Sequence, residues 1–182
     1  MFTNQYWGLK DYSGLRQGFG LQTYANGSLY LGQRMNDIKD GMGAYVSPDG
    51  ELQEGEFIGD KIFGAGTSVG KDGKVYSGQF QHGKREGVGQ ISENGTEFVG
   101  RFKSSKRHGV AMLRDMKTNK IIKGIYNNGQ LQGFVIIKHL DSGYMYTGYV
   151  KDSLLHGIGE EIRDQAVYFG EFEKSLSHGI GY

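Results

Sequence analysis

A two-part pattern returns every 22 to 24 residues along this chain, and it limits the possible folds more than any other feature. The first part reads aromatic-x-Gly in most copies and begins near residues 6, 30, 53, 76, 98, 122, 146 and 168. The second part reads Gly-x-Gly in most copies and follows eleven or twelve residues later. A fixed period of roughly 20–50 residues is the signature of a repeat architecture. The sequence therefore predicts one tandem array over residues 1–182, in a single domain.

Each copy has the pattern of a β-hairpin. In residues 76–80 (YSGQF) an aromatic, a glycine and a second aromatic occupy alternate positions, so a strand would put them on one face. Residues 87–91 (GVGQI) alternate in the same way, and the polar stretch 81–86 (QHGKRE) between them is predicted to be a loop. Asn94-Gly95 then gives the strongest short signal for a hairpin turn. The predicted fold class is all-β, an antiparallel meander of about eight hairpins.

The chain has 32 glycines, and those inside the predicted strands need a reason. Glycine weakens a strand because it has no side chain to pack. It becomes useful where a neighbouring aromatic ring lies across the bare backbone. We therefore interpret the recurring aromatic and glycine residues as structural positions of the repeat, namely Tyr6, Gly8, Tyr30, Gly32, Gly55, Tyr76, Gly78, Phe98, Gly100, Gly124, Tyr146, Gly148, Tyr168 and Gly170.

The pattern resembles the MORN repeat (membrane occupation and recognition nexus), which reads roughly Tyr-x-Gly-x-Phe, a loop, Gly-x-Gly and a turn. Residues 76–98 match it best, and the resemblance covers residues 6–182. It implies an extended, twisted antiparallel β-meander in a single layer, with an aromatic-lined groove along one side. The departures from the pattern are Lys10 and Arg34 at aromatic positions, Gln53 at the leading aromatic, and Ala111 and Val135 at the second glycine. Copies five and six also have weaker turn sequences, so we expect a bend or irregularity near residues 109–143.

Sites for catalysis, metals or cofactors are not expected. The chain has no cysteine, which excludes thiolate metal sites and is typical of a reducing compartment. Residues 64–70 (GAGTSVG) have the wrong spacing for a dinucleotide loop and belong to the repeat. His108, His156 and His178 occupy one position in three copies, too far apart to share a metal. Because no catalytic motif is present, we expect that the protein is not an enzyme. Because there is no secretory signal and no apolar run of about 20 residues, we expect it to be cytoplasmic.

Charge is unevenly distributed although the net charge is only +1. Residues 71–123 carry 12 Lys or Arg against 5 Asp or Glu, while the segments on either side are acidic. This segment is a candidate surface for an acidic partner, with nucleic acid disfavoured by the acidic flanks; the alternative is a solvated face without a ligand. The candidate residues are Arg101, Lys103, Lys106, Arg107, Arg114, Lys117, Lys120 and Lys123.

The middle residue of Gly-x-Gly is apolar in every copy. Period-two alternation puts it on the face opposite the tyrosines, where a single sheet has no second layer to cover it. These residues either pack beneath long neighbouring side chains or form a stripe that docks a partner. Besides Ala65, the candidate stripe consists of Phe19, Met42, Val88, Val110, Phe134, Ile158 and Ile180.

The functional expectation comes from the resemblance, since no site supplies one. MORN arrays serve in cytoskeletal and ciliary structures and at cell membranes, where they hold proteins in place. We expect a non-catalytic scaffold or assembly protein, associated with the cytoskeleton or a cilium, whose partners are other proteins in a heteromeric complex; a homodimer stays open. The alternative is an acidic-phospholipid-binding module that recruits or regulates a partner enzyme. A third possibility is the accessory half of an enzyme, because MORN arrays precede kinase or methyltransferase domains in some proteins.

Overall fold

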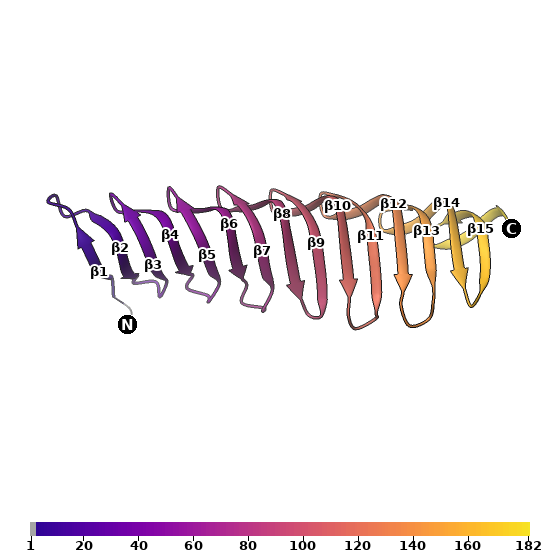
Figure 1. Ribbon diagram of the computed structural model, residues 1–182, viewed down its shortest axis with the longest axis horizontal. Coiled ribbons are helices and arrows are strands. Elements are labelled where there is room, and N and C mark those ends of the chain that lie inside the picture. The colour runs from indigo at the N-terminus through magenta and orange to yellow at the C-terminus, as the bar shows by residue number, and fades with distance from the viewer. Residues whose placement is uncertain (1–2) are drawn as a thin grey trace. The chain divides into compact units, whose positions relative to one another are not determined.

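The computed structural model describes residues 3–182, and these residues form hairpins throughout. Sixteen antiparallel strands make one sheet in which the order of the strands is their order in the chain. Figure 1 shows the hairpins following one another along the sheet. No helix occurs within residues 3–182. The predicted all-β meander of about eight hairpins is confirmed.

Contacts between Cα atoms divide the chain into two compact units, with the division between residues 89 and 90. The first unit contains β1 (Gln5–Lys10), β2 (Arg16–Thr23), β3 (Leu29–Met35), β4 (Ile38–Val46), β5 (Leu52–Ile58), β6 (Lys61–Val69) and β7 (Val75–Gln81). The division falls inside β8 (Lys84–Glu93). The second unit contains β9 (Thr96–Lys103), β10 (Lys106–Asp115), β11 (Lys120–Asn127), β12 (Gln130–His139), β13 (Met145–Lys151), β14 (Leu154–Arg163), β15 (Ala166–Glu173) and β16 (Leu176–Gly181). The single domain stays a prediction.

The turns inside the repeats are shorter than the sequence indicated. Residues 81–86 were expected to form a loop, and this is wrong: His82 and Gly83 alone make the turn, and β8 begins at Lys84. Both turn residues have positive φ, 51° and 81°. Turns of this kind have the same twist as the strands they join, so both strands can continue up to the turn.

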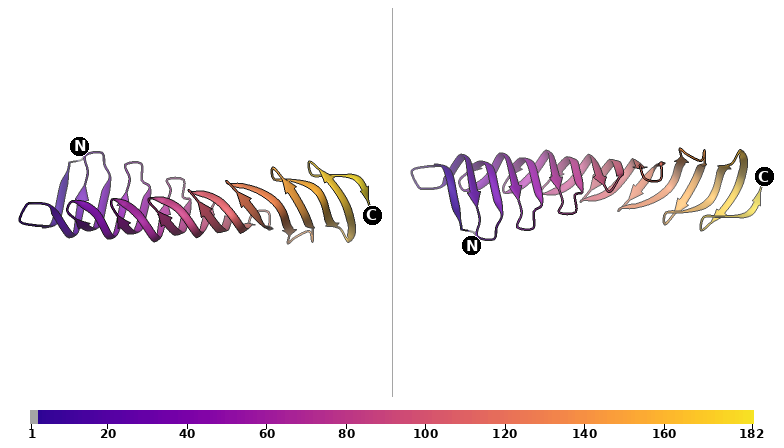
Figure 2. Two further views of the ribbon diagram at one scale, coloured as in Figure 1. Left: turned by 90° about the horizontal axis from the view of Figure 1, so that it is seen from above. Right: turned by 90° about the horizontal axis from the view of Figure 1, so that it is seen from below.

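The connections between repeats join the strands at the ends opposite to the turns inside the repeats, and they vary in length (Figure 2). Asn94 and Gly95 form a two-residue turn with positive φ at both positions, as predicted. After β2, the backbone N–H of Gly27 instead donates to the carbonyl of Tyr24 at 2.9 Å, within a longer loop. Since these loops differ from copy to copy, the sequence period is not exact.

A β-bulge interrupts the pairing inside the repeats at Gly-x-Gly. Gly8 pairs with Gly20, but Leu9 pairs with Gln17, so two residues of β2 have no partner in β1. The same shift recurs in six other hairpins. The first glycine of the motif has φ between 63° and 97° in all eight copies, a conformation that side chains with a Cβ rarely adopt. Glycine at this position is therefore a backbone requirement.

The tyrosine of the repeat lies across glycines on two adjacent strands. A Cβ on Gly78 or on Gly89 would come within 2.6 Å of the Tyr76 hydroxyl oxygen, so neither position has room for a side chain. That hydroxyl donates to the carbonyl of Gln79 at 2.7 Å. Tyr6, Tyr30, Tyr146 and Tyr168 make the same bond to the carbonyl three residues ahead.

Other side chains fill the tyrosine position where the pattern departs. In the third copy, which has Gln53, the fully buried Ile62 reaches across Gly66. In the sixth, Leu131 and Val135 cover Gly124. Strand pairing from β10 to β13 has only the bulges that the other repeats also have. The expected irregularity near residues 109–143 is thus absent from the strand register, because apolar side chains replace the ring without disturbing the ladder.

Candidate interaction surfaces

One face of the sheet in each unit, which we call the inner face, is a packed aromatic core. Tyr30, Tyr76, Phe98 and Tyr146 are at most 1 % exposed. Neighbouring repeats meet edge to face, as Tyr30 and Phe57 do in the first unit, with ring centroids 5.5 Å apart. Burial raises the pKa of Tyr30, Tyr76 and Tyr146 to about 12. These rings stabilise the fold and are not accessible to a partner.

Basic side chains cover several of the buried rings. The Arg107 guanidinium lies 4.5 Å from the centroid of Phe98, and the Lys39 ammonium lies 4.1 Å from that of Tyr45. Arg16 and Arg85 have equivalent positions over Tyr6 and Tyr76. These cations all come two residues before Gly-x-Gly, a recurrence that the sequence analysis missed. Cation–π contact makes them part of the core.

Arg34 is the most buried cation of the inner face, with 4 % of its surface exposed. Its guanidinium donates to the Asp37 carbonyl at 2.6 Å and to the Tyr24 hydroxyl at 2.8 Å, and lies 4.9 Å from the Tyr30 ring centroid. Lys39 pairs with Arg34 across the strands. Burial, and then the nearby Arg34 charge, lower the pKa of Lys39. Arg34 thus fills an aromatic position by stacking on a ring.

The opposite, outer face carries the candidate stripe. Each stripe residue directly follows the positive-φ glycine of its copy, and the exposed fractions run from 48 % for Phe134 to 79 % for Ile180. Phe134 contacts Tyr149 edge to face, with centroids 5.8 Å apart. The stripe residues are therefore exposed. Their role in docking a partner stays a prediction.

In the first unit the stripe belongs to a larger apolar surface that the sequence analysis did not identify. Strands β1 to β4 bring exposed apolar side chains together by cross-strand pairing, such as Leu31 opposite Leu21 and Ile38 opposite Met35. We call this surface the apolar face; it consists of Trp7, Leu9, Phe19, Leu31, Met35, Ile38 and Met42, all at least 42 % exposed. The alternation of these apolar residues with the inner-face residues was the signal that could have found it.

The predicted basic patch in the second unit is divided between two faces. Arg107 is on the inner face over Phe98, while Lys117 and Lys120 lie at the β10–β11 loop, where Lys120 pairs with Asp115. The remaining five residues lie on the outer face of β9 to β11. We call them the basic face: Arg101, Lys103, Lys106, Arg114 and Lys123.

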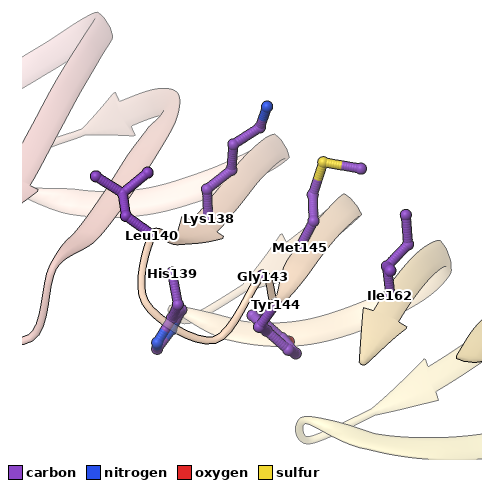
Figure 3. A pocket seen from close by; sticks show the side chains of 7 residues that line it. All are labelled: Lys138, His139, Leu140, Gly143, Tyr144, Met145 and Ile162. Atoms are coloured by element: carbon purple, nitrogen blue, oxygen red, sulfur yellow. The ribbon is translucent and has the colours of Figure 1, made fainter. Parts of the chain in front are cut away.

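Small hollows occur near the ends of the strands. One lies at the turn between β12 and β13, where Lys138, Met145 and Ile162 extend to one side of the strands and His139 and Tyr144 to the other (Figure 3). The His139 and Tyr144 rings are 5.1 Å apart. No group of three His, Asp or Glu side chains within residues 3–182 could hold a metal ion. No helix in this part of the chain is long and apolar enough to cross a membrane.

Comparison with known families identifies the repeat. The family model "MORN repeat" matches residues 12–29, 30–51, 54–75 and 76–97. The four matches are consecutive and together span residues 12–97. Residues 98–182 have hairpins and bulges like those of the matched residues, and Tyr146 and Tyr168 cover glycines as Tyr76 does. MORN repeats are generally modules for interaction with proteins or lipids and are not catalytic.

A solved structure has a similar fold. It is the TCP domain of Drosophila melanogaster SAS-4 (dCPAP), in complex with a proline-rich motif of Ana2 (dSTIL). The similarity covers 90 % of this chain and 88 % of that domain, with a TM-score of 0.51 and 8 % sequence identity. At this identity the similarity extends to the fold alone. No curated protein matches the sequence significantly.

Proposed function

We propose that this chain is a non-catalytic scaffold that holds other proteins in a cytoskeletal, ciliary or membrane-associated assembly in the cytoplasm. The observation that carries the proposal is the row of exposed apolar side chains on an uncovered sheet face. Exposed apolar area of this extent is unusual unless a partner covers it. The proline-rich motif bound by the SAS-4 domain supports a protein-binding use of such a sheet, without indicating the same ligand here.

The test compares two variants of the whole chain as baits in cell extract. One variant has Phe19, Met42, Phe134 and Ile158 changed to serine. The matched control has four comparably exposed apolar residues outside both the stripe and the apolar face changed to serine, namely Ile58, Met116, Leu140 and Leu154. Proteins captured by the intact chain are then purified and titrated against all three baits. We expect the stripe variant to lose at least about tenfold in affinity, since exposed apolar anchors dominate such interfaces. Equal affinities for all three baits would contradict the proposal.

The second candidate function is binding of acidic phospholipid, with recruitment or regulation of an enzyme. It is favoured by the cations of the basic face, which could meet a negatively charged membrane surface. Flotation with anionic vesicles separates the two functions. Flotation of the intact chain without capture of any protein would favour the lipid function over the scaffold.

A further inference from the structure

The basic face has an unbalanced charge. None of its five cations forms an ion pair with another residue in 3–182. Glu97 is the carboxylate that shares this face of β9 and β10, and it pairs across the strands with Arg114. Uncompensated charge of one sign on a surface attracts a ligand of the opposite sign.

Apolar side chains lie among these cations. Val99 pairs with Met112, and Val110 of the stripe pairs with Ile125, so the four come from three adjacent strands. Their exposed fractions run from 38 % for Met112 to 73 % for Val110. Lys103 and Lys106 lie beyond them toward the β9–β10 turn, and Arg114 lies toward the other end of β10. An apolar centre with a charged rim is the usual anatomy of a protein–protein interface.

We infer that the outer face of β9 to β11 binds an amphipathic helix of a partner protein, with apolar residues on one side and Asp or Glu along its flanks. This inference rests on the proposed scaffold function and names the chemistry of one partner. A helix is the usual second layer over a one-sided sheet, and its width of about 10 Å covers the two strand spacings from β9 to β11. Val99 and Met112 are more covered than Val110, as in the centre of an interface, whereas a membrane anchor needs projecting apolar groups.

The test uses the whole chain and a fluorescent peptide of about 18 residues, with leucine at helical spacing and glutamate elsewhere. A control peptide has the same composition in scrambled order. At about 0.1 M salt, where surface charges still interact, fluorescence anisotropy should show at least about tenfold tighter binding of the amphipathic peptide. Equal binding of the two peptides would overturn the inference, because charge alone would then explain the affinity.

Two pairs of variants locate the site. The first pair reverses four charges to Glu. In the site variant these are Arg101, Lys103, Lys106 and Arg114, and peptide binding should weaken at least about tenfold. In the control variant they are Lys61, Lys71, Lys84 and Lys151, and peptide binding should not weaken. Val110→Asp should also weaken binding, while Val88→Asp, at the same repeat position, should not. Equal losses in the site and control variants would overturn the assignment. All these side chains are exposed, so circular dichroism should show every variant folded.

Vesicles of phosphatidylcholine with about 30 % phosphatidylserine distinguish a membrane from a protein ligand. The inference predicts peptide binding and no flotation of the chain. Flotation that depends on the basic face, without peptide binding, would overturn it in favour of lipid. If the peptide does not bind but the stripe variant loses its captured proteins, this inference fails while the scaffold function stands.

Discussion

The two units have the same inner face but different outer faces. In each unit a tyrosine or its replacement covers paired glycines, and a bulge follows. The outer face of β1 to β4 is an apolar face, whereas β9 to β11 present five cations around apolar residues. Packing limits which residue types can occupy the inner face, so the repeats have similar residues at these positions. The outer positions are under no such constraint, and the two outer faces differ in their side chains.

The largest expected effect comes from removing an inner ring. Tyr76→Ala in the first unit and Tyr146→Ala in the second should each cost about 3–5 kcal/mol, because each deletes a fully buried aromatic side chain. Urea denaturation followed by circular dichroism measures the free energy of unfolding. A loss below about 1 kcal/mol in either unit would break the claim that the two inner faces are equivalent.

A smaller loss is expected at the bulge. Gly157→Ala should destabilise the chain by about 1–2 kcal/mol, because its φ of 70° strains any residue with a Cβ. The nearest atom to the added Cβ is 3.8 Å away, so the loss reports backbone conformation and not a clash. Thermal unfolding of Gly157→Ala beside Gly143→Ala, a loop glycine also at positive φ with open space, should give similar losses. An unchanged melting temperature for both would contradict the strain account.

Stability should fall as the pH rises from about 10 to about 12. The folded-state pKa of Tyr30, Tyr76, Tyr144 and Tyr146 is raised to about 12 by burial. Protonated tyrosine is thus favoured in the folded state, and its contribution is complete below pH 10 and lost as the pH approaches 12. Urea titrations across this range should show a weaker decline for Tyr76→Phe. A decline as steep as in the intact chain would exclude Tyr76 as a contributor.

The smallest effect is expected on the outer faces. Met35→Ser in the apolar face and Lys123→Ser in the basic face should each change the free energy of unfolding by less than about 0.5 kcal/mol, since both side chains are exposed. The same urea experiment applies. A loss above about 1 kcal/mol at either residue would indicate that the outer face takes part in folding, and would remove the distinction between the two faces.

The spacing of tyrosine and glycine was sufficient to predict the hairpins and to expect rings over bare backbone. The turns inside the repeats were not predictable from their composition. Ser104 and Ser105 form a two-residue turn with φ of 49° and 66°, although neither belongs to the residue types that favour this conformation. The polar residues around this turn therefore indicated a loop, and a loop assigns no face to its residues. For this reason the basic patch was predicted as one surface, although Arg107 stacks on Phe98 inside.

The bulge also could not be predicted from the sequence pattern. Gly-x-Gly is compatible with a regular strand, and the two unpaired residues of β2 become visible only in the register against β1. Alternation correctly gave the face of the stripe, but not its projection at a bulge. The partner chemistry of the outer faces depends on which side chains meet across strands, as Val110 and Ile125 do. Residues from different repeats cannot be assigned to one surface until this register is known.

The most direct test of the central claim is hydroxyl-radical footprinting of the chain alone and in complex with a captured partner. The account predicts that Phe19, Met42, Met112 and Phe134 are oxidised in the free chain, and that those beneath the partner become protected. Tyr30, Tyr76 and Tyr146 should remain unmodified in both states, because they are buried in the inner core. Oxidation of these tyrosines in the free chain, or a complex that protects none of the outer residues, would contradict the account.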